Sequence, residues 1–359
     1  MSRLREPPVI HPENARSTQQ RGMTLPLKWP VSIRLLVLGV LLIVAFLAAV
    51  RLGAVSITMR ELFEAIAGRG DPTLVTIIQE LRLPRAIQAT LVGAALAVSG
   101  ATFQALLRNP LAEPYILGVS SGAAAGAVVT VVTGWSARFV WSLPLAAFAG
   151  AVLSMLVVFR IAFSVGRALD TRVLLLAGVV MSSFLVAVIW LVLTFADTES
   201  VRSAIFWMMG SHAGASWRSV GILTVCFVPA FVILLALARP LNLLAIGEPT
   251  AAYLGTSVEA TKVVAFGTAT LLTAAAVSVC GTIGFVGLVV PHAIRLLWGS
   301  DNRTLLPCAA LAGGAFLVSA DTLARTVAGA NELPIGIVTA LVGVPCFVWL
   351  LRRPSFAGR

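Results

Sequence analysis

Runs of about twenty apolar residues, separated by charged or Pro/Gly-rich segments, recur along nearly the whole chain. An α-helix needs about 20 apolar residues to cross the hydrocarbon of a bilayer, and lipid offers no partner for an unpaired backbone group. Hydrophobic residues make up 58% of the sequence and charged residues only 11%, compared with about 25% charged in soluble domains. These features predict an all-α polytopic membrane protein.

We expect ten transmembrane spans, of which the third and the eighth are the least regular because they border Gly/Pro-rich sequence. The spans cover roughly residues 35–52, 83–107, 115–133, 142–162, 173–195, 220–238, 262–281, 284–298, 304–328 and 334–351. The chain then divides into an N-terminal tail (residues 1–33), a ten-span domain (34–353) and a short C-terminal tail (354–359).

The formal net charge of +11 raises the question of a nucleic-acid partner, but the basic residues follow the loops between spans. If the N-terminus is cytoplasmic, most of the 26 lysines and arginines face the cytoplasm. The ones that fall outside are Arg51, Arg60, Arg69, Arg82, Arg85, Arg138, Arg202, Arg218 and Arg325. This bias follows the positive-inside rule. It predicts that both termini are cytoplasmic, and that membrane lipid rather than nucleic acid surrounds the chain.

The segment Gly118-Val119-Ser120-Ser121-Gly122 matches the GxSxG pattern of serine hydrolases, whose chemistry needs a strand-to-helix turn. Here the surroundings are an apolar helix candidate. Gly118, Gly122 and Gly126 at four-residue spacing give one helix face that a neighbouring helix can approach closely. We favour helix packing, with an intramembrane hydrolase as the alternative. The four cysteines and three histidines are scattered, so we expect no metal site and no cofactor.

No GxxxxGK[ST] phosphate-binding loop occurs in the sequence, so energy for uphill transport would come from a partner subunit or an ion gradient. Ionisable side chains inside spans mark ion-coupling paths. Only Asp321 lies well within a predicted span, and Arg325 follows four residues later, where the pair can neutralise itself. This scarcity disfavours a gradient-driven secondary transporter, which remains the alternative.

The loop between the sixth and seventh spans, "RPLNLLAIGEPTAAYLG" (Arg239 to Gly255), has the pattern of two short helices. Pro240 and Pro249 suit the starts of these helices, and Gly247 and Gly255 suit their ends. Such a loop either docks in a groove of a cytosolic protein or lies on the lipid headgroups.

Six stretches, in order from about residue 35 to 353, resemble the FecCD-type permease subunits of ATP-binding-cassette importers for iron siderophores, haem and vitamin B12. They are "LRLPRAIQATLVGAALAVSGATFQALLRNPLAEPYILGVSSGAAAG", "LLLAGVVMSSF", "FWMMGSHAGASW", "LNLLAIGEPTAAYLG", "GTIGFVGLVVPHAIRLLWGSDNRTLLP" and "NELPIGIVTALVGVPCFVWLL". The resemblance implies a type II importer permease with no enzymatic activity of its own. It also implies a location in the bacterial inner membrane.

As partners the resemblance implies a second copy of this chain, cytosolic ATP-binding subunits and a periplasmic or extracellular solute-binding protein. It places ATPase coupling in residues 239–257, at Glu248, Ala251, Ala252 and Gly255. It places docking of the binding protein at Arg82, Arg85 and Arg325. A cytoplasmic gate maps to Asp170 and Thr171, although Asp170 departs from the small hydroxyl residues common in relatives.

The implied mechanism is alternating access for an iron chelate, with vitamin B12 or another corrinoid as the alternative substrate. Spans two to five and seven to ten also allow an inverted repeat, with broken segments near residues 110–114 and 281–291. In the first of these segments, Asn109 and the two prolines are predicted to end one helix and start the next.

Overall fold

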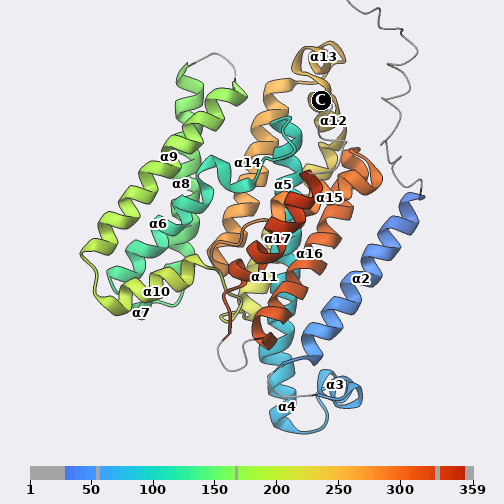
Figure 1. The fold of residues 1–359 in the computed structure, drawn as a ribbon, viewed down its shortest axis with the longest axis vertical. Helices are drawn as coiled ribbons and strands as arrows, with labels where there is room; N and C mark the ends of the chain where they lie inside the picture. The colour runs from blue at the N-terminus through green and yellow to red at the C-terminus, as the bar shows by residue number, and fades with distance from the viewer. Residues whose placement is uncertain (1–28, 54–56, 166–168, 328–331, 352–359) are drawn as a thin grey trace, which may run out of the picture.

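The computed structural model describes residues 29–53, 57–165, 169–327 and 332–351, and these ranges are helical with no β-strand. Residues 1–28 of the predicted N-terminal tail and the whole predicted C-terminal tail lie outside the described residues. Figure 1 shows a bundle of long helices running between two ends.

Ten helices coincide with the ten predicted spans. They are α2 (Val31–Arg51), α5 (Leu83–Leu106), α6 (Val119–Val132), α8 (Ser142–Val165), α9 (Thr171–Thr194), α11 (Trp217–Ala236), α14 (Val258–Cys280), α15 (Val286–Trp298), α16 (Asn302–Val327) and α17 (Ile335–Leu351). Seven are long and apolar enough to cross a membrane, whereas α6, α15 and α17 are shorter apolar helices. The predicted all-α polytopic fold is confirmed.

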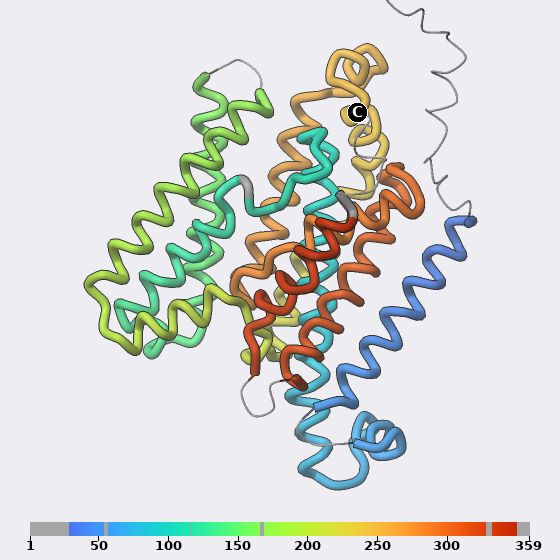
Figure 2. The backbone as a smooth tube through the Cα atoms, in the orientation of Figure 1, coloured from blue at the N-terminus to red at the C-terminus, as the bar shows by residue number. Residues whose placement is uncertain are grey.

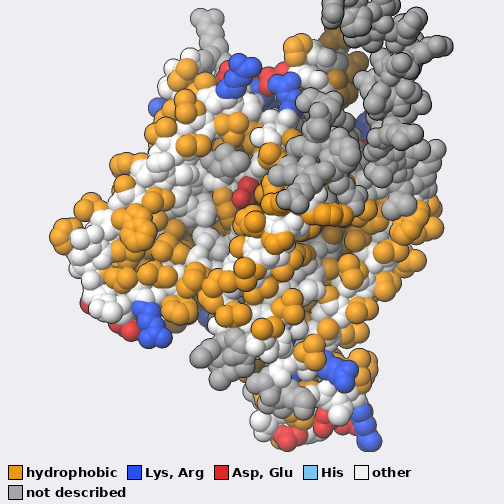
Figure 3. Space-filling model, in the orientation of Figure 1, with side chains coloured by type: hydrophobic (Ala, Val, Ile, Leu, Met, Phe, Trp, Pro, Cys, Tyr) orange, Lys and Arg blue, Asp and Glu red, His pale blue; other side chains and the backbone are white. Residues whose placement is uncertain are grey.

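Short helices mark the two ends of the bundle (Figure 1). At one, the α3 end, lie α3 (Met59–Ile66), α4 (Pro72–Thr76), the π-helical turn η1 (Ile77–Arg82), α7 (Trp135–Arg138) and α10 (Thr198–Met208). At the other, the α13 end, lie α12 (Ala238–Ile246) and α13 (Glu248–Tyr253). Figure 3 shows charged side chains gathered mainly at these ends, with hydrophobic side chains covering the surface between them.

Helix α5 is the centre of the bundle, and α11, α14, α15 and α16 pack around it (Figure 2). Every residue from Val92 to Leu106 is buried. By contrast α2, α8, α9 and α11 carry many large exposed hydrophobic side chains, among them Leu36, Leu153, Trp190 and Val225. An apolar surface of this extent suits contact with lipid.

Glycines bring the central helices to backbone contact. A Cβ atom at Gly93 would collide with the carbonyl oxygen of Gly313 on α16, and one at Gly313 would collide with Gly93. Likewise, a Cβ atom at Gly100 would overlap the carbonyl group of Gly287 on α15. Without side chains at these positions the helices gain dispersion contacts along their backbones, which is the main source of helix association in lipid.

The two predicted broken segments lie against each other inside the bundle. Tyr115 Oη donates to the carbonyl oxygen of Ile283 at 2.8 Å and accepts from the Ile283 N–H at 3.0 Å. The Glu113 carboxylate accepts from the Phe285 N–H at 2.9 Å. These bonds satisfy non-helical backbone at membrane depth, where water is absent. They make up for the shortness of α6 and α15, which have 14 and 13 residues and span about 20 Å at 1.5 Å per residue.

The turn predicted after α5 is confirmed, with one addition. Helix α5 ends at Leu106, Asn109 Oδ1 accepts from the Leu111 N–H at 2.9 Å, and Pro114 starts the 3-10 turn η2 (Pro114–Leu117). The sequence did not predict that Ala112 and Leu117 would be buried. In both halves a long helix, a short helix and a second long helix follow one another, α5–α6–α8 and α14–α15–α16. This order agrees with an inverted repeat, which stays a prediction.

Tyr115 and Tyr253, the two tyrosines of the chain, give a matched test of the contact between the broken segments. Tyr115→Phe leaves the N–H and the carbonyl oxygen of Ile283 without this partner, at a cost of about 1–3 kcal/mol. Tyr253 is 91% exposed, so Tyr253→Phe should have no effect. We expect a lower thermal unfolding midpoint in detergent for Tyr115→Phe alone, and equal midpoints would contradict this role.

Candidate functional site

Two short helices project at the α13 end and form what we call the knob, residues 238–255. Helix α12 buries Leu241 and Leu244, and α13 buries Ala251. Gly247 separates the two helices, Pro249 lies in the first turn of α13, and Gly255 follows it with a positive φ of 83°. The predicted pair of helices is confirmed, although α12 begins at Ala238, before Pro240.

The knob exposes three large apolar side chains. Ile246 is 70% exposed, Tyr253 91% and Leu254 57%. Among the predicted coupling residues, Ala252 and Gly255 share this exposed side, whereas Ala251 is fully buried. Glu248 turns toward the bundle, where its Oε2 atom lies 2.9 Å from Lys262 Nζ on α14. The knob therefore has an apolar outer side and an anchored inner side.

Lys262 is 2% exposed, and its Nζ also donates to the carbonyl oxygen of Leu169 at 2.6 Å. Lys262 is the first residue of the predicted seventh span and lies in the second turn of α14, so its ammonium group is buried at the α13 end and not well within a span. The sequence carried a signal for this lysine: it lies three residues after Glu259, at the start of an apolar run, and the two groups are 3.7 Å apart. A charge in such a position needs a buried partner.

The predicted gate residues Asp170 and Thr171 lie at the start of α9, directly after Leu169. Asp170 Oδ1 accepts from the Arg172 N–H at 2.7 Å, so Asp170 is the N-cap of α9. Aspartate is among the best N-cap residues, which gives a structural reason for its presence here. Thr171 Oγ1 is buried.

At the α3 end, two of the three predicted docking arginines, Arg85 and Arg325, form ion pairs with Asp321. Arg85 Nη2 lies 3.0 Å from Asp321 Oδ1, and Arg85 Nη1 lies 2.9 Å from Glu332 Oε1. Arg325 Nε lies 3.7 Å from Asp321 Oδ2. The pair that the spacing of Asp321 and Arg325 predicts is present, but Arg85 is the closer partner and comes from another helix.

Arg82 and Arg325 also bind the end of α2. Arg82 Nη1 donates to the carbonyl oxygens of Val50 at 2.9 Å and Arg51 at 2.8 Å, and Arg325 Nη2 donates to the Ala49 carbonyl oxygen. The last carbonyl groups of a helix have no partner within the helix. These two guanidinium groups therefore fix α2 against α5 and α16.

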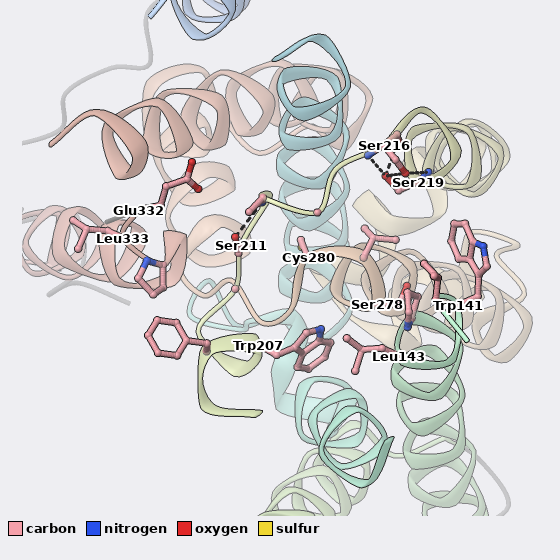
Figure 4. A pocket seen from close by; sticks show the side chains of 18 residues that line it. Trp141, Leu143, Trp207, Ser211, Ser216, Ser219, Ser278, Cys280, Glu332 and Leu333 are labelled. Carbon is pink, nitrogen blue, oxygen red and sulfur yellow. Dashed lines mark hydrogen bonds between the residues drawn. The ribbon is translucent and has the colours of Figure 1, made fainter. Parts of the chain in front are cut away.

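A cavity of about 550 Å³ opens beside this cluster. Figure 4 shows Trp141 and Trp207 on its walls, with Ser211, Cys280 and Glu332 around them. Glu332 lines the cavity and also pairs with Arg85. The cavity thus combines aromatic walls with a carboxylate at its edge.

The segment between α10 and α11 reaches inward to form one wall of the cavity. The Ser211 N–H donates to the Cys280 carbonyl oxygen at 2.7 Å, and the Ile335 N–H donates to the Gly210 carbonyl oxygen at 3.0 Å. This segment is therefore held between the end of α14 and the start of α17. Gln88 and Ser219, which the sequence did not single out, hydrogen-bond to each other behind it at 2.5 Å.

The three glycines at four-residue spacing, Gly118, Gly122 and Gly126, have two structural settings. Gly122 faces Gly150 and Gly126 faces Ala146, both on α8, at distances that leave no room for a Cβ atom. Gly118 precedes α6 with a positive φ of 78° and accepts from Ser154 Oγ at 2.9 Å. Across the described part of the chain, no three His, Cys, Asp or Glu side chains form a metal-binding group.

The family model described as the FecCD transport family matches residues 41–353. Uncharacterized ABC transporter permease protein YvrB of Bacillus subtilis is 43% identical over 299 residues, covering 83% of this chain and 84% of that protein. The vitamin B12 import system permease protein BtuC of Escherichia coli is 40% identical, covering 90% and 95%. The cobalamin import system permease protein BtuC of Halobacterium salinarum is 46% identical, covering 78% and 74%.

Solved structures agree on the fold. A chain described as a metal-chelate type ABC transporter in an inward-facing conformation superposes with a TM-score of 0.80 at 33% identity, covering 88% of this chain and 98% of that one. PsaBC from Streptococcus pneumoniae superposes with a TM-score of 0.55 at 16% identity, covering 84% and 98%, and shares the fold alone. The bundle has the type II architecture of ABC importer permeases, and the chain is a member of the FecCD transport family.

Proposed function

We propose that this chain is the membrane-spanning subunit of an importer that moves a bulky metal chelate inward across the bacterial inner membrane. The observation that carries the proposal is the knob. It presents Ile246, Tyr253 and Leu254 beyond the end of the bundle, and its inner side is fixed to α14 by Glu248 and Lys262. An exposed apolar surface on an anchored element suits a soluble partner that moves the element.

In the proposed mechanism, ATP binding and hydrolysis occur on separate cytosolic subunits that grip the knob. Two copies of this chain then rock against each other and open a path between them, first to one side of the membrane and then to the other. The chain itself supplies the shape of the path, because a strong binding site within it would slow release of the substrate. In this orientation the α13 end and both termini face the cytoplasm.

A solute-binding protein is proposed to dock at the α3 end, over the cavity lined by Trp141, Trp207 and Glu332. Arg82, Arg85 and Arg325 already bind groups of this chain. The docking role predicted for them is compatible with their positions only if an acidic group of the binding protein displaces one of these groups. Arg85 is the best placed, since its second ion pair is with Glu332, whose side chain is 44% exposed. A carboxylate of the binding protein that replaces Glu332 would leave the buried Asp321 pair intact.

For the substrate, an iron chelate and a corrinoid are both supported. The sequence-based preference is an iron chelate. Relatives named for vitamin B12 or cobalamin import, at 40% and 46% identity, support a corrinoid. The solved structure described as a metal-chelate type ABC transporter supports the wider class of metal chelates. Both substrates are large, rigid metal–organic complexes, and aromatic side chains such as Trp141 and Trp207 suit their apolar faces.

The decisive experiment is uptake into proteoliposomes that contain this chain, its ATPase and its binding protein. We expect uptake of either a ferric siderophore, haem or cobalamin that needs ATP and persists when an uncoupler removes ion gradients. Uptake that follows an imposed gradient without ATP would instead identify a secondary transporter. Loss of a hydrolytic activity in Ser120→Ala, with assembly of the complex intact, would point to an intramembrane hydrolase.

The knob is tested by Tyr253→Asp combined with Leu254→Asp. Each side chain contributes about 1.5–3 kcal/mol when buried in an interface, so we expect at least tenfold weaker association with the ATPase. The matched control is Phe63→Asp, because Phe63 is 61% exposed but lies on α3 at the opposite end. Copurification of the ATPase with the double variant at wild-type yield would refute the coupling role.

Docking of the binding protein is tested at Arg85 and Glu332. Arg85→Gln should weaken docking, Glu332→Gln should strengthen it by removing the internal competitor, and added salt should reduce both differences. Arg303→Gln, at the other end of α16, is the control. If the affinity of both variants at low salt equals that of the wild type, Arg85 has no part in docking.

A further inference from the structure

The ammonium group of Lys262 is buried at the α13 end, where three separate parts of the chain meet. The side chain is 3% exposed and belongs to the second turn of α14. A buried ammonium group is unfavourable unless acceptors surround it. The groups that accept hydrogen bonds from Lys262 therefore show which parts of the structure this ammonium group holds together.

The nearest acceptors come from outside α14. Glu248 Oε2, at 2.9 Å, belongs to the first turn of α13, and the Leu169 carbonyl oxygen, at 2.6 Å, directly precedes α9. Glu259 Oε1, on α14 itself, lies 3.7 Å from the ammonium group, which makes it an ion-pair partner and not a hydrogen-bond acceptor. Lys262 thus joins the knob to the start of α9 through one charged group.

Leu169 is held on both sides of its backbone. Its carbonyl oxygen accepts from Lys262, and its N–H donates to the two carboxylate oxygens of Glu259 at 3.1 and 3.2 Å. Its side chain is fully buried. The next residue, Asp170, caps α9. A displacement at Leu169 therefore moves the first turn of α9, which contains the predicted gate.

We propose that Lys262, with Glu248 and Glu259, transmits the movement of the knob to the first turn of α9. The knob has an apolar outer side that a partner can grip and an inner side that ends in Glu248. A pull on α13 changes the position of the Glu248 carboxylate, and the ammonium group, whose side chain is 3% exposed, follows it because a buried charge without its partner is unfavourable. Glu248 then acts inward, as a positioning residue, and the outer side chains make the contact with the ATPase.

This inference rests on the proposed function, and its test measures uptake and ATP hydrolysis in the same proteoliposomes. Lys262→Met keeps the length of the side chain and removes its charge. We expect a complex that assembles and hydrolyses ATP within about twofold of the wild type but consumes at least tenfold more ATP per substrate imported. Lys262→Arg, which keeps the charge with a different donor geometry, should restore part of the coupling.

Arg160→Met is the matched control, since Arg160 is an exposed cation in the last two turns of α8, the helix that precedes Leu169 in the chain. The ratio of ATP consumed to substrate imported should equal that of the wild type in this variant. A structural role alone would lower assembly, hydrolysis and uptake together and leave the ratio unchanged. If Lys262→Met does not assemble, the ratio is measured in Glu248→Gln, where we expect an increase of at least threefold.

The outcomes separate this inference from the function on which it rests. Absence of ATP-dependent uptake by the wild-type complex would overturn the proposed function. ATP-dependent uptake by the wild type, together with an unchanged ratio in Lys262→Met or in its substitute Glu248→Gln, would overturn the transmission role alone. A raised ratio in the lysine variant with a normal ratio in Arg160→Met would support it.

Discussion

The bundle depends on direct contact between helix backbones around α5. In lipid the hydrophobic effect does not drive helices together, so association relies on dispersion and on hydrogen bonds between helices. Gly93 against Gly313 and Gly100 against Gly287 bring α16 and α15 as close to α5 as backbone atoms permit. The helices α2, α8, α9 and α11 contribute residues to the core on one side and expose large apolar side chains on the other.

Close packing at the centre also permits two interruptions of the helices. Non-helical backbone is tolerated inside a membrane protein only where other groups satisfy it. Glu113 and Tyr115 do this for the segment before α15. The short helices α6 and α15, which follow the interruptions, pack against α14 and α5 respectively, so each short helix contacts the long helix of the other predicted repeat.

Charged groups are buried at both ends, in different settings. At the α3 end, Arg85 and Asp321 form a pair next to arginines that hold the last carbonyl groups of α2. At the α13 end, Lys262 joins the knob to the start of α9. Breaking a buried pair by removing one partner leaves an uncompensated charge. Both clusters therefore hold the elements that they join in fixed positions.

The sequence by itself determined the order of the ten apolar helices, the interruption after α5, the two helices of the knob and the family. Apolar run length, prolines, glycines and ordered motifs are local features, which is why they can be read from the sequence. It did not find the buried position of Lys262, the pairing of Arg85 with Asp321, or the contact of Tyr115 with Ile283. Each joins residues that are far apart in the sequence or turns a side chain inward rather than outward. Only the tertiary structure decides such contacts, because the same arginine or lysine at the end of a span can reach solvent or the protein interior, and the packing of neighbouring helices selects between them.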